Sequence, residues 1–409
     1  MQNTKALKKT IISAIAILSI FLFWKFLTLL LPYFPDKTWK LSNSSKTITF
    51  SHNGEMIAYA TGELISKQIN PNPGMRDNVA DTSKVEIRKV SSGKLIQSFD
   101  FFAASRITFS PDNSAIAIGG YGGKIEIWRI KDRKLLYSFR DGEHYFYETS
   151  LLAFSPDGTT LIVGTGDSSF PISSRPGQVS VRNLSEDRIK YTISERYICA
   201  ASSSDGQLIT LSGKIPINIY RVNDGSILRQ IETETNKNIC SDLKFSADNR
   251  LLILKTKSSF KGDLNIYRVE DGKLLHRMFI REPYRERQTL SDFALTVDNQ
   301  YLAASYRVVD QSSLFINSPT YPKALFGSIR IWNVENGKLI ATLWGHRKGT
   351  NEIAISPDGK WLASAGRDST IKFWRIPPRN NNWVWLLIGG VLAALIYWRR
   401  NDLVDWINH

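Results

Sequence analysis

The sequence predicts an all-β protein, a seven-bladed β-propeller, on two observations of repetition. A turn with the sequence Ser-Pro-Asp-Gly or a variant of it occurs seven times, and the ends of successive copies are 43 to 60 positions apart. A second tight turn, usually Asp-Gly or Asn-Gly, recurs downstream, and these residues accept the positive φ that hairpin turns need. Four short β-rich runs fit each period of about 45 residues, which is the composition of a propeller blade.

The two kinds of turn divide each unit into four strands. The first turn recurs, strongly or weakly, at 50–54, 109–113, 154–158, 202–206, 245–249, 295–299 and 355–359. The second turn recurs at 92–95, 224–227, 271–274 and 336–339. Long insertions at about 62–83, 166–177, 256–262 and 306–327 fall between the second and third strands. All four insertions should therefore lie on one face of the ring, opposite both kinds of tight turn.

The predicted propeller occupies residues 36–376, and its closure involves both ends. The seventh unit stops after its third strand, at 373–376, with no second turn after it. An unpaired strand edge would invite aggregation. We therefore predict that an N-terminal strand at 38–43 supplies the missing fourth strand of the last blade.

An apolar run of 21 residues, 11–31, follows the basic segment 1–10. As a helix it would cross a hydrocarbon core of about 30 Å. No small-residue cleavage site ends the run, which favours an uncleaved signal anchor over a removable signal peptide.

A second apolar run at 383–398 carries tryptophan and tyrosine at its ends, as membrane-interface residues do, and a short tail at 399–409 follows it. We predict a second transmembrane helix here, with a buried element of the propeller or a sorting tail as alternatives. Basic residues flank the outer end of both runs, which places both termini in the cytoplasm and the propeller across the membrane. Arg375 and Arg379 precede the second run and act against this orientation.

The unit that contains the run SPDGKWLASAGRDSTIKFW resembles the WD40-repeat family. The resemblance covers about residues 38–376. Within the family, the repeats resemble those of bacterial, above all cyanobacterial, members. In that family a His, a Ser or Thr, an Asp and a Trp form a hydrogen-bonded set inside a blade, and the matching residues are His346, Ser364, Asp368 and Trp374. The other units lack the complete set, and a TolB-like or quinoprotein-like propeller is the alternative fold.

Loops on the insertion-bearing face mix aromatic residues with arginine, which is the composition of binding hot spots. We predict that this face, turned away from the membrane, binds a partner protein or a glycan. The alternative is that these residues pack the long loops onto the blades. The candidate partner-binding residues are Phe101, Phe102, Tyr145, Phe146, Tyr147, Phe170, Arg175, Tyr284, Arg285, Phe315, Tyr321 and Phe326.

The sequence carries no motif for catalysis, a cofactor or a metal. It lacks a phosphate-binding loop, a G-x-S-x-G elbow and an H-E-x-x-H helix. Two cysteines and five histidines exclude a disulfide framework and a Cys- or His-rich metal centre. Cys199 and Cys240 fall in corresponding first strands of neighbouring units, where packing as small apolar residues is expected and a disulfide is the alternative. The recurring Asp residues are spread around the ring, so we expect them to form turns.

The formal charge of +15 comes from 53 Lys and Arg against 38 Asp and Glu. Residues 36–382 hold 47 of the basic and 36 of the acidic residues, a net charge of +11. These charges are dispersed over all the units, which argues against a nucleic-acid-binding face. An anionic membrane surface is the nearest acidic partner for a tethered domain.

The sequence therefore predicts a non-enzymatic, membrane-tethered scaffold for protein–protein interaction. One alternative is a sensor that binds a ligand or glycan and signals across the membrane. A second is an enzyme that uses the central channel. A third, if the topology is inverted, is a cytoplasmic scaffold.

Overall fold

The computed structural model describes residues 35–62, 64–66, 78–80, 82–142, 147–167, 177–195, 197–213, 216–233, 239–257, 262–278, 288–308, 327–347 and 349–378. In these ranges every regular element is a strand, and no helix long and apolar enough to cross a membrane occurs. The segments 1–10, 11–31, 383–398 and 399–409 lie outside them, so the predicted membrane helices stay predictions.

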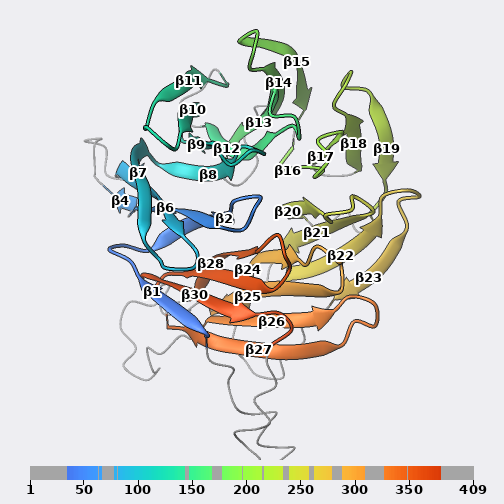
Figure 1. Cartoon of the computed structure of the whole chain (residues 1–409). Coiled ribbons are helices and arrows are strands. Elements are labelled where there is room, and N and C mark those ends of the chain that lie inside the picture. The colour runs from blue at the N-terminus through green and yellow to red at the C-terminus, as the bar shows by residue number, and fades with distance from the viewer. Residues whose placement is uncertain are drawn as a thin grey trace, which may run out of the picture.

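The described strands form seven four-stranded antiparallel sheets that follow one another around a ring (Figure 1). Each sheet is one blade, and its first strand lies innermost. Blade 1 contains β2 (Ser45–Phe50), β3 (Met56–Thr61), β6 (Thr82–Lys89) and β7 (Leu95–Phe102). Blade 2 contains β8 (Ala104–Phe109), β9 (Ala115–Gly120), β10 (Lys124–Arg129) and β11 (Leu135–Arg140). Blade 3 contains β12 (Tyr147–Phe154), β13 (Thr160–Asp167), β14 (Gly177–Asn183) and β15 (Arg188–Glu195).

The next three blades repeat this order. Blade 4 contains β16 (Cys199–Ser202), β17 (Leu208–Ser212), β18 (Ile217–Arg221) and β19 (Ile227–Ile231). Blade 5 contains β20 (Ile239–Phe245), β21 (Leu251–Lys257), β22 (Gly262–Arg268) and β23 (Leu274–Met278). Blade 6 contains β24 (Gln288–Leu295), β25 (Tyr301–Val308), β26 (Gly327–Asn333) and β27 (Leu339–His346).

Blade 7 is built from both ends of the described chain. It contains β28 (Thr350–Ile355), β29 (Trp361–Gly366), β30 (Thr370–Arg375) and, as its fourth strand, β1 (Lys37–Lys40). The register pairs Lys37 with Phe373 and Lys40 with Thr370. The closing strand thus lies where the sequence places it, and its regular part is shorter than the predicted range 38–43.

The recurrent first turns owe their shape to a serine or threonine hydroxyl and, in every blade except the first, an aspartate. In blade 2, Ser110 Oγ donates to Asp112 Oδ1 at 2.6 Å and accepts a hydrogen bond from the amide of Ala115 at 2.9 Å. The last turn residue has a positive φ, 60° at Asn113 and 71° at Gly158. Asparagine and glycine tolerate this conformation, so the recurring Asp residues serve turn formation.

The core lies between the blades rather than inside any one of them. One cluster joins Val85 and Phe99 of blade 1 to Ile107 and Ile116 of blade 2. Because each blade packs on both faces, strands near the ring axis lose the polar alternation of a half-exposed sheet. In β9 every residue is buried.

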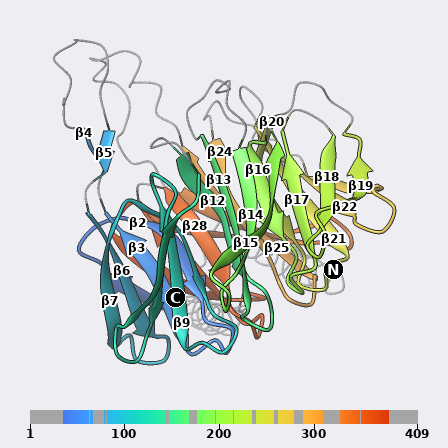
Figure 2. The same cartoon turned by 90° about the horizontal axis from the view of Figure 1, so that it is seen from above.

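Both kinds of tight turn lie on one face of the ring, which we call the tight-turn face. The second strands β3, β13, β21 and β25, after which the four insertions begin, end on the opposite face, which we call the insertion face. In the first insertion, β4 (Leu64–Ser66) pairs with β5 (Asn78–Ala80), and Figure 2 shows this hairpin at the edge opposite the tight turns.

Candidate functional site

The four side chains that resemble the WD40 set are hydrogen-bonded across the boundary between blades 6 and 7. His346 ends β27, and its Nε2 lies 2.8 Å from Ser364 Oγ in β29. Trp374 Nε1 in β30 donates to the same Ser364 Oγ at 2.9 Å. His346 Nδ1 lies 3.0 Å from Asp368 Oδ1. The set therefore ties blade 6 to blade 7.

The Asp368 carboxylate is held in its ionised form by this network. Burial opposes ionisation, but hydrogen bonds with His346 and Thr370 and the amide of Arg347 outweigh it. The pKa of Asp368 consequently falls far below its usual range. A carboxylate that is saturated in this way stabilises the fold and is poorly suited to proton transfer.

Two other blade boundaries use different side chains at the corresponding place. Asp141, which follows β11, accepts hydrogen bonds from Gln178 and Ser180 of β14. Glu195, which ends β15, accepts hydrogen bonds from Asn218 Nδ2 at 2.8 Å and Tyr220 OH at 2.5 Å. In both cases, a polar residue at the end of a fourth strand reaches the third strand of the next blade, as His346 does through Thr370 of β30.

Most of the predicted partner-binding residues lie outside the described part of the chain. This applies to Tyr145, Phe146, Phe170, Arg175, Tyr284, Arg285, Phe315, Tyr321 and Phe326. Tyr147 opens β12, and its side chain is not described. Phe102 ends β7 and is half-buried.

Phe101 is a core residue rather than a surface contact. Its side chain is 2% exposed and packs in the cluster between blades 1 and 2. The ammonium group of Lys124 lies 5.4 Å from the centroid of its ring. At the boundary between blades 1 and 2, Phe101 thus occupies the place that Asp141, Glu195 and His346 occupy at other blade boundaries.

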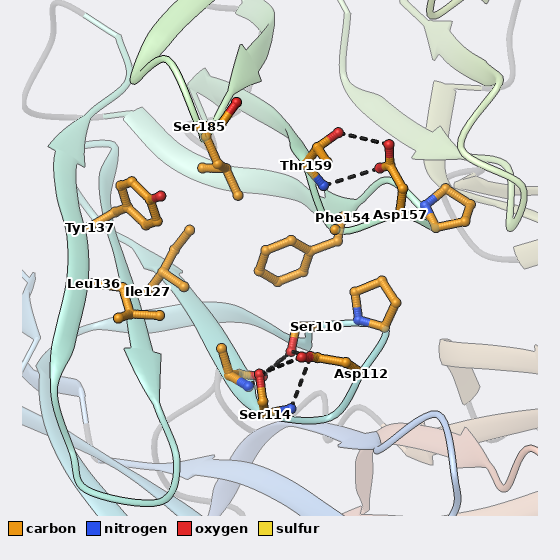
Figure 3. Close-up of a pocket in the computed structure, with 15 residues that line it drawn as sticks. Ser110, Asp112, Ser114, Ile127, Leu136, Tyr137, Phe154, Asp157, Thr159 and Ser185 are labelled. Carbon is orange, nitrogen blue, oxygen red and sulfur yellow. Dashed lines mark hydrogen bonds between the residues drawn. The ribbon is translucent and has the colours of Figure 1, made fainter.

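A cleft of about 600 Å³ opens on the tight-turn face between blades 2 and 3. The first turns of the two blades, with Asp112 and Asp157, form one wall, and Ile127 and Leu136 line the other side. Figure 3 shows the ring of Phe154 between these two sides. The cleft suits an apolar group of a partner.

The Asp157 carboxylate at this cleft is occupied by its own turn. Ser155 Oγ donates to it at 2.5 Å, and the amide and hydroxyl of Thr159 also donate. These hydrogen bonds lower the pKa of Asp157 to about 2. Asp157 therefore contributes a fixed negative charge to the cleft.

Acidic side chains, one buried and one half-buried, cap the inner edges of neighbouring blades. Glu352 Oε2 in β28 accepts a hydrogen bond from the amide of Ile48 in β2 at 2.9 Å. Asp292 Oδ2 in β24 accepts one from the amide of Ile353 in β28 at 2.8 Å. Burial, and the negative charge of Asp292, raise the pKa of Glu352 to about 7, against the attraction of Arg106.

Basic side chains satisfy the carbonyl groups of other inner strands. Lys244 Nζ donates to Phe293 O at 2.6 Å and to Asp292 Oδ1 at 2.7 Å. Arg106 Nε donates to Ser150 O at 3.0 Å. Acids and bases together thus link consecutive blades around the ring axis.

Sequence reasoning missed these inner-strand charges, although a signal is present. All except Lys244 stand three positions before the last residue of a first strand that is otherwise mostly apolar. The residues in this position are Arg106, Asp242, Asp292 and Glu352. A charge at a fixed place in several repeats indicates a common structural contact.

Cys199 and Cys240 form a disulfide, with Cα atoms 6.1 Å apart. The bond joins β16 of blade 4 to β20 of blade 5, and both residues are buried. We expected from the sequence that the two cysteines pack as free, small apolar residues, and this expectation was wrong. The alternative, a disulfide between them, is what the structure contains. The disulfide is a covalent member of the set of links between inner strands.

Within the described ranges, no group of three or more His, Cys, Asp or Glu side chains is placed to hold a metal ion. The titratable side chains described above are engaged in turns or blade boundaries.

Comparison with known proteins assigns the last repeat. The seven sheets define the class, a seven-bladed β-propeller, and residues 337–375 match the family "WD domain, G-beta repeat". The match covers β27 to β30 and the hydrogen-bonded set around His346. The last repeat of the chain therefore matches the WD40-repeat family, as its sequence predicts.

Relatives in this family resemble parts of the chain. It is 26% identical over 243 residues to GID complex subunit 7 of Schizosaccharomyces pombe, covering 58% of this chain and 41% of that protein. It is 39% identical over 64 residues to small ribosomal subunit protein RACK1y of Oryza sativa subsp. japonica, covering 15% and 19%. It is 42% identical over 55 residues to Polycomb protein EED of Chaetomium thermophilum, covering 13% and 10%. The chain thus spans less than half the length of each.

Proposed function

We propose that this protein is a membrane-tethered scaffold that binds partner proteins and performs no catalysis. The observation that carries the proposal is a WD40-repeat propeller whose buried polar side chains are engaged in contacts between blades. Relatives named as subunits of a complex or of the ribosome support a role in assembly. What such a ring offers a partner is its rigid, extended surface.

The proposed tether consists of the apolar segments 11–31 and 383–398, with the propeller outside the cytoplasm. Basic residues at the outer end of both segments support this orientation. The disulfide between Cys199 and Cys240 supports it independently, because disulfides persist in oxidising compartments and are rare in the cytosol.

The proposed orientation turns the tight-turn face toward the membrane. Both ends of the described chain leave from that face and lie together. The amide of Asp36 donates to Phe373 O at 2.8 Å, and the amide of Arg375 donates to Asp36 Oδ2 at 3.1 Å. Short linkers from these ends to membrane segments would hold the face within a few residues of the bilayer.

Partner binding is assigned to the insertion face, which then points away from the membrane. The support is the aromatic and arginine content of its loops. A protein partner is favoured over a glycan because the relatives are named as components of protein assemblies. The cleft between blades 2 and 3 lies on the opposite face and is not assigned to this partner.

Affinity purification of the full chain in detergent tests the proposal. A variant with Tyr284, Arg285 and Tyr321 replaced by Ala is expected to lose its co-purifying proteins by tenfold or more. The matched control replaces Ile227 and Leu228, exposed on the tight-turn face, by Ala. Partners kept by the first variant and lost by the control would reject the assignment of the face.

Catalysis at the ring axis is a second candidate, favoured by one observation. The pKa of Glu352, about 7, suits a general acid or base. Its Oε2, however, accepts a hydrogen bond from the main-chain amide of Ile48. Such a bond is needed by a side chain that caps a strand, and it is not needed by a group that transfers protons. The geometry therefore supports the scaffold better.

A further inference from the structure

Aliphatic residues are exposed in pairs where the fourth strands of several blades begin. Leu95 and Ile96 are 43% and 39% exposed, and Leu135 and Leu136 are 40% and 38% exposed. Blades 4 and 6 carry equivalent pairs, Ile227–Leu228 and Leu339–Ile340. Each pair follows a second turn and therefore lies at the outer rim of the tight-turn face.

Charge distinguishes the pairs of blades 1 and 2 from the others. The turn before Leu95 carries Lys89 and Lys94 and no acid, and residues 131–134 carry Lys131, Arg133 and Lys134, all exposed. The one acid there, Asp132, forms an ion pair with Arg129 at 2.9 Å. We call residues 94–96 and 131–136 the basic rim.

The turns of blades 4 and 6 do not share this excess. The turn of blade 4 has one base, Arg221, and one acid, Asp224. The turn of blade 6 has Glu335 and Lys338. These blades therefore offer the same aliphatic geometry without the positive charge, and they serve as internal controls.

The two parts of the basic rim are held together and lie beside the point where the chain enters the propeller. The guanidinium of Arg133 lies 5.8 Å from the ring centroid of Phe99 in blade 1. Lys37 Nζ, at the start of β1, donates to Val90 O at 3.0 Å and Ser91 O at 3.1 Å in the second turn of blade 1. The rim thus adjoins the chain segment that leads from residue 36 toward the N-terminus.

We propose that the basic rim of blades 1 and 2 docks on the surface of an anionic phospholipid bilayer. The aliphatic side chains enter the boundary between headgroups and acyl chains, and the lysines stay at the level of the phosphates. Lys and Arg near such a surface are attracted by its negative potential. The inference rests on the proposed function for the orientation of the tight-turn face, and it adds the lipid class and the contacting residues.

The contact would fix the rotation of the propeller on its tether. Two linkers alone leave the ring free to tilt about its attachment point. A third contact at blades 1 and 2 sets one edge of the tight-turn face against the bilayer. The insertion face is then presented to partners in a defined direction.

Depth-dependent fluorescence quenching tests the proposal on the full chain. The chain is reconstituted in nanodiscs of phosphatidylcholine alone or mixed with phosphatidylglycerol, both containing a spin-labelled lipid as quencher. A fluorophore is attached at Leu135→Cys, with Leu339→Cys as the control site in blade 6. Without reductant the native cysteines stay paired and unlabelled.

We expect quenching at position 135 to exceed that at position 339 at least twofold in the anionic discs. The excess is expected to disappear in neutral discs, and also when Lys94, Lys131 and Lys134 are replaced by Gln. Equal quenching at the two sites, or no response to phosphatidylglycerol, would overturn the proposal. Protection of the rim by a bound protein, without any response to anionic lipid, would overturn it as well.

Failure of the tether is distinguished by a separate measurement. If alkaline carbonate releases the full chain from membranes, the proposed tether is rejected and the basic rim is tested by flotation with vesicles of the same two compositions. Flotation with anionic vesicles alone, lost in the lysine-to-glutamine variant, would support the rim without the tether. Absence of flotation would reject both.

Discussion

At the residue scale, titratable side chains that repeat through the sequence satisfy the backbone of the ring. Asp112 and Asp157 close their own turns, and Asp292 caps the amide of the next blade. An unpaired polar group in such positions would cost about 1–3 kcal/mol, so each position selects a side chain that can pair. Repetition of an acid around a ring therefore indicates a repeated structural contact.

The replacement Asp368→Asn is expected to lower the free energy of unfolding by about 1–3 kcal/mol. The carboxylate is bonded to His346, Thr370 and the amide of Arg347, and an amide oxygen cannot replace all three contacts. Urea unfolding at neutral pH measures the loss. The exposed Asp132→Asn should leave the midpoint unchanged, and an equal effect of both would contradict this role.

The pH dependence of Asp368 follows from its lowered pKa. The folded state binds the proton more weakly than the unfolded state, in which the pKa of an aspartate is near its usual value of 3.8. The contribution of Asp368 to stability is therefore complete when the pH is above the unfolded-state pKa. It is lost as the pH falls from the unfolded-state pKa toward the lower pKa of the folded state. The difference between the wild-type chain and Asp368→Asn should shrink correspondingly in acid.

The replacement Glu352→Gln is expected to remove a pH dependence of opposite sign. The pKa of Glu352 rises from the usual glutamate value of 4.5 to about 7 in the fold, so the folded state binds the proton more tightly. Stability should therefore fall as the pH rises through this interval. The wild-type chain should lose more unfolding free energy than the variant between about pH 5 and about pH 8. Parallel unfolding curves at both pH values would reject the assignment.

The contacts between blades were predictable only where a family pattern exists, whereas the turn contacts of the recurring Asp residues followed from their repetition. His346, Ser364, Asp368 and Trp374 were recognisable because all four stand at the positions that the family uses. Glu195 at the end of β15 occupies a place equivalent to that of His346 with different chemistry, so no fixed residue pattern identifies it. Its signal is positional, a polar residue six or seven places after the start of a fourth strand.

At the element scale, the closure of the ring depends on a strand of four residues. Trp39 in β1 packs its ring 4.6 Å from the centroid of Phe373 and lies against Gly93 of blade 1. The sequence predicted this strand because the last unit lacks its fourth. The predicted end at residue 43 was too late because Ser42 and Asn43 form a bend instead of pairing with β30.

Deletion of residues 36–43 is expected to lower the melting temperature of the full chain by about 10 °C or more. The deletion removes the pairing with β30 and exposes an edge that the native fold covers. The graded variant Trp39→Ala should cost about 2 kcal/mol, since the ring is only partly buried. The exposed Lys40→Ala in the same strand is the control. An unchanged melt of the deletion would reject the closure.

At the scale of the whole molecule, the fold brings part of the positive charge together at one place on the surface. The net charge of +11 over residues 36–382 is dispersed in the sequence, but the fold gathers exposed Lys89, Lys94, Lys131, Arg133 and Lys134 at neighbouring blades. The number of blades and the common face of the insertions followed from the repeat period alone. The gathering of charge did not, because residues of different repeats become neighbours only when the ring closes.

The disulfide tests the compartment and the stability of the ring together. Cys199 and Cys240 are 41 positions apart, and closing a loop of that length constrains the unfolded chain by about 4 kcal/mol in the chain-entropy model. The double variant Cys199→Ser, Cys240→Ser is therefore expected to melt below the oxidised wild type and close to the reduced wild type. Alkylation of the denatured chain in whole-cell lysates made without reductant should leave both cysteines unmodified if the propeller folds outside the cytoplasm. Full modification would place the propeller in a reducing compartment and reverse the proposed topology.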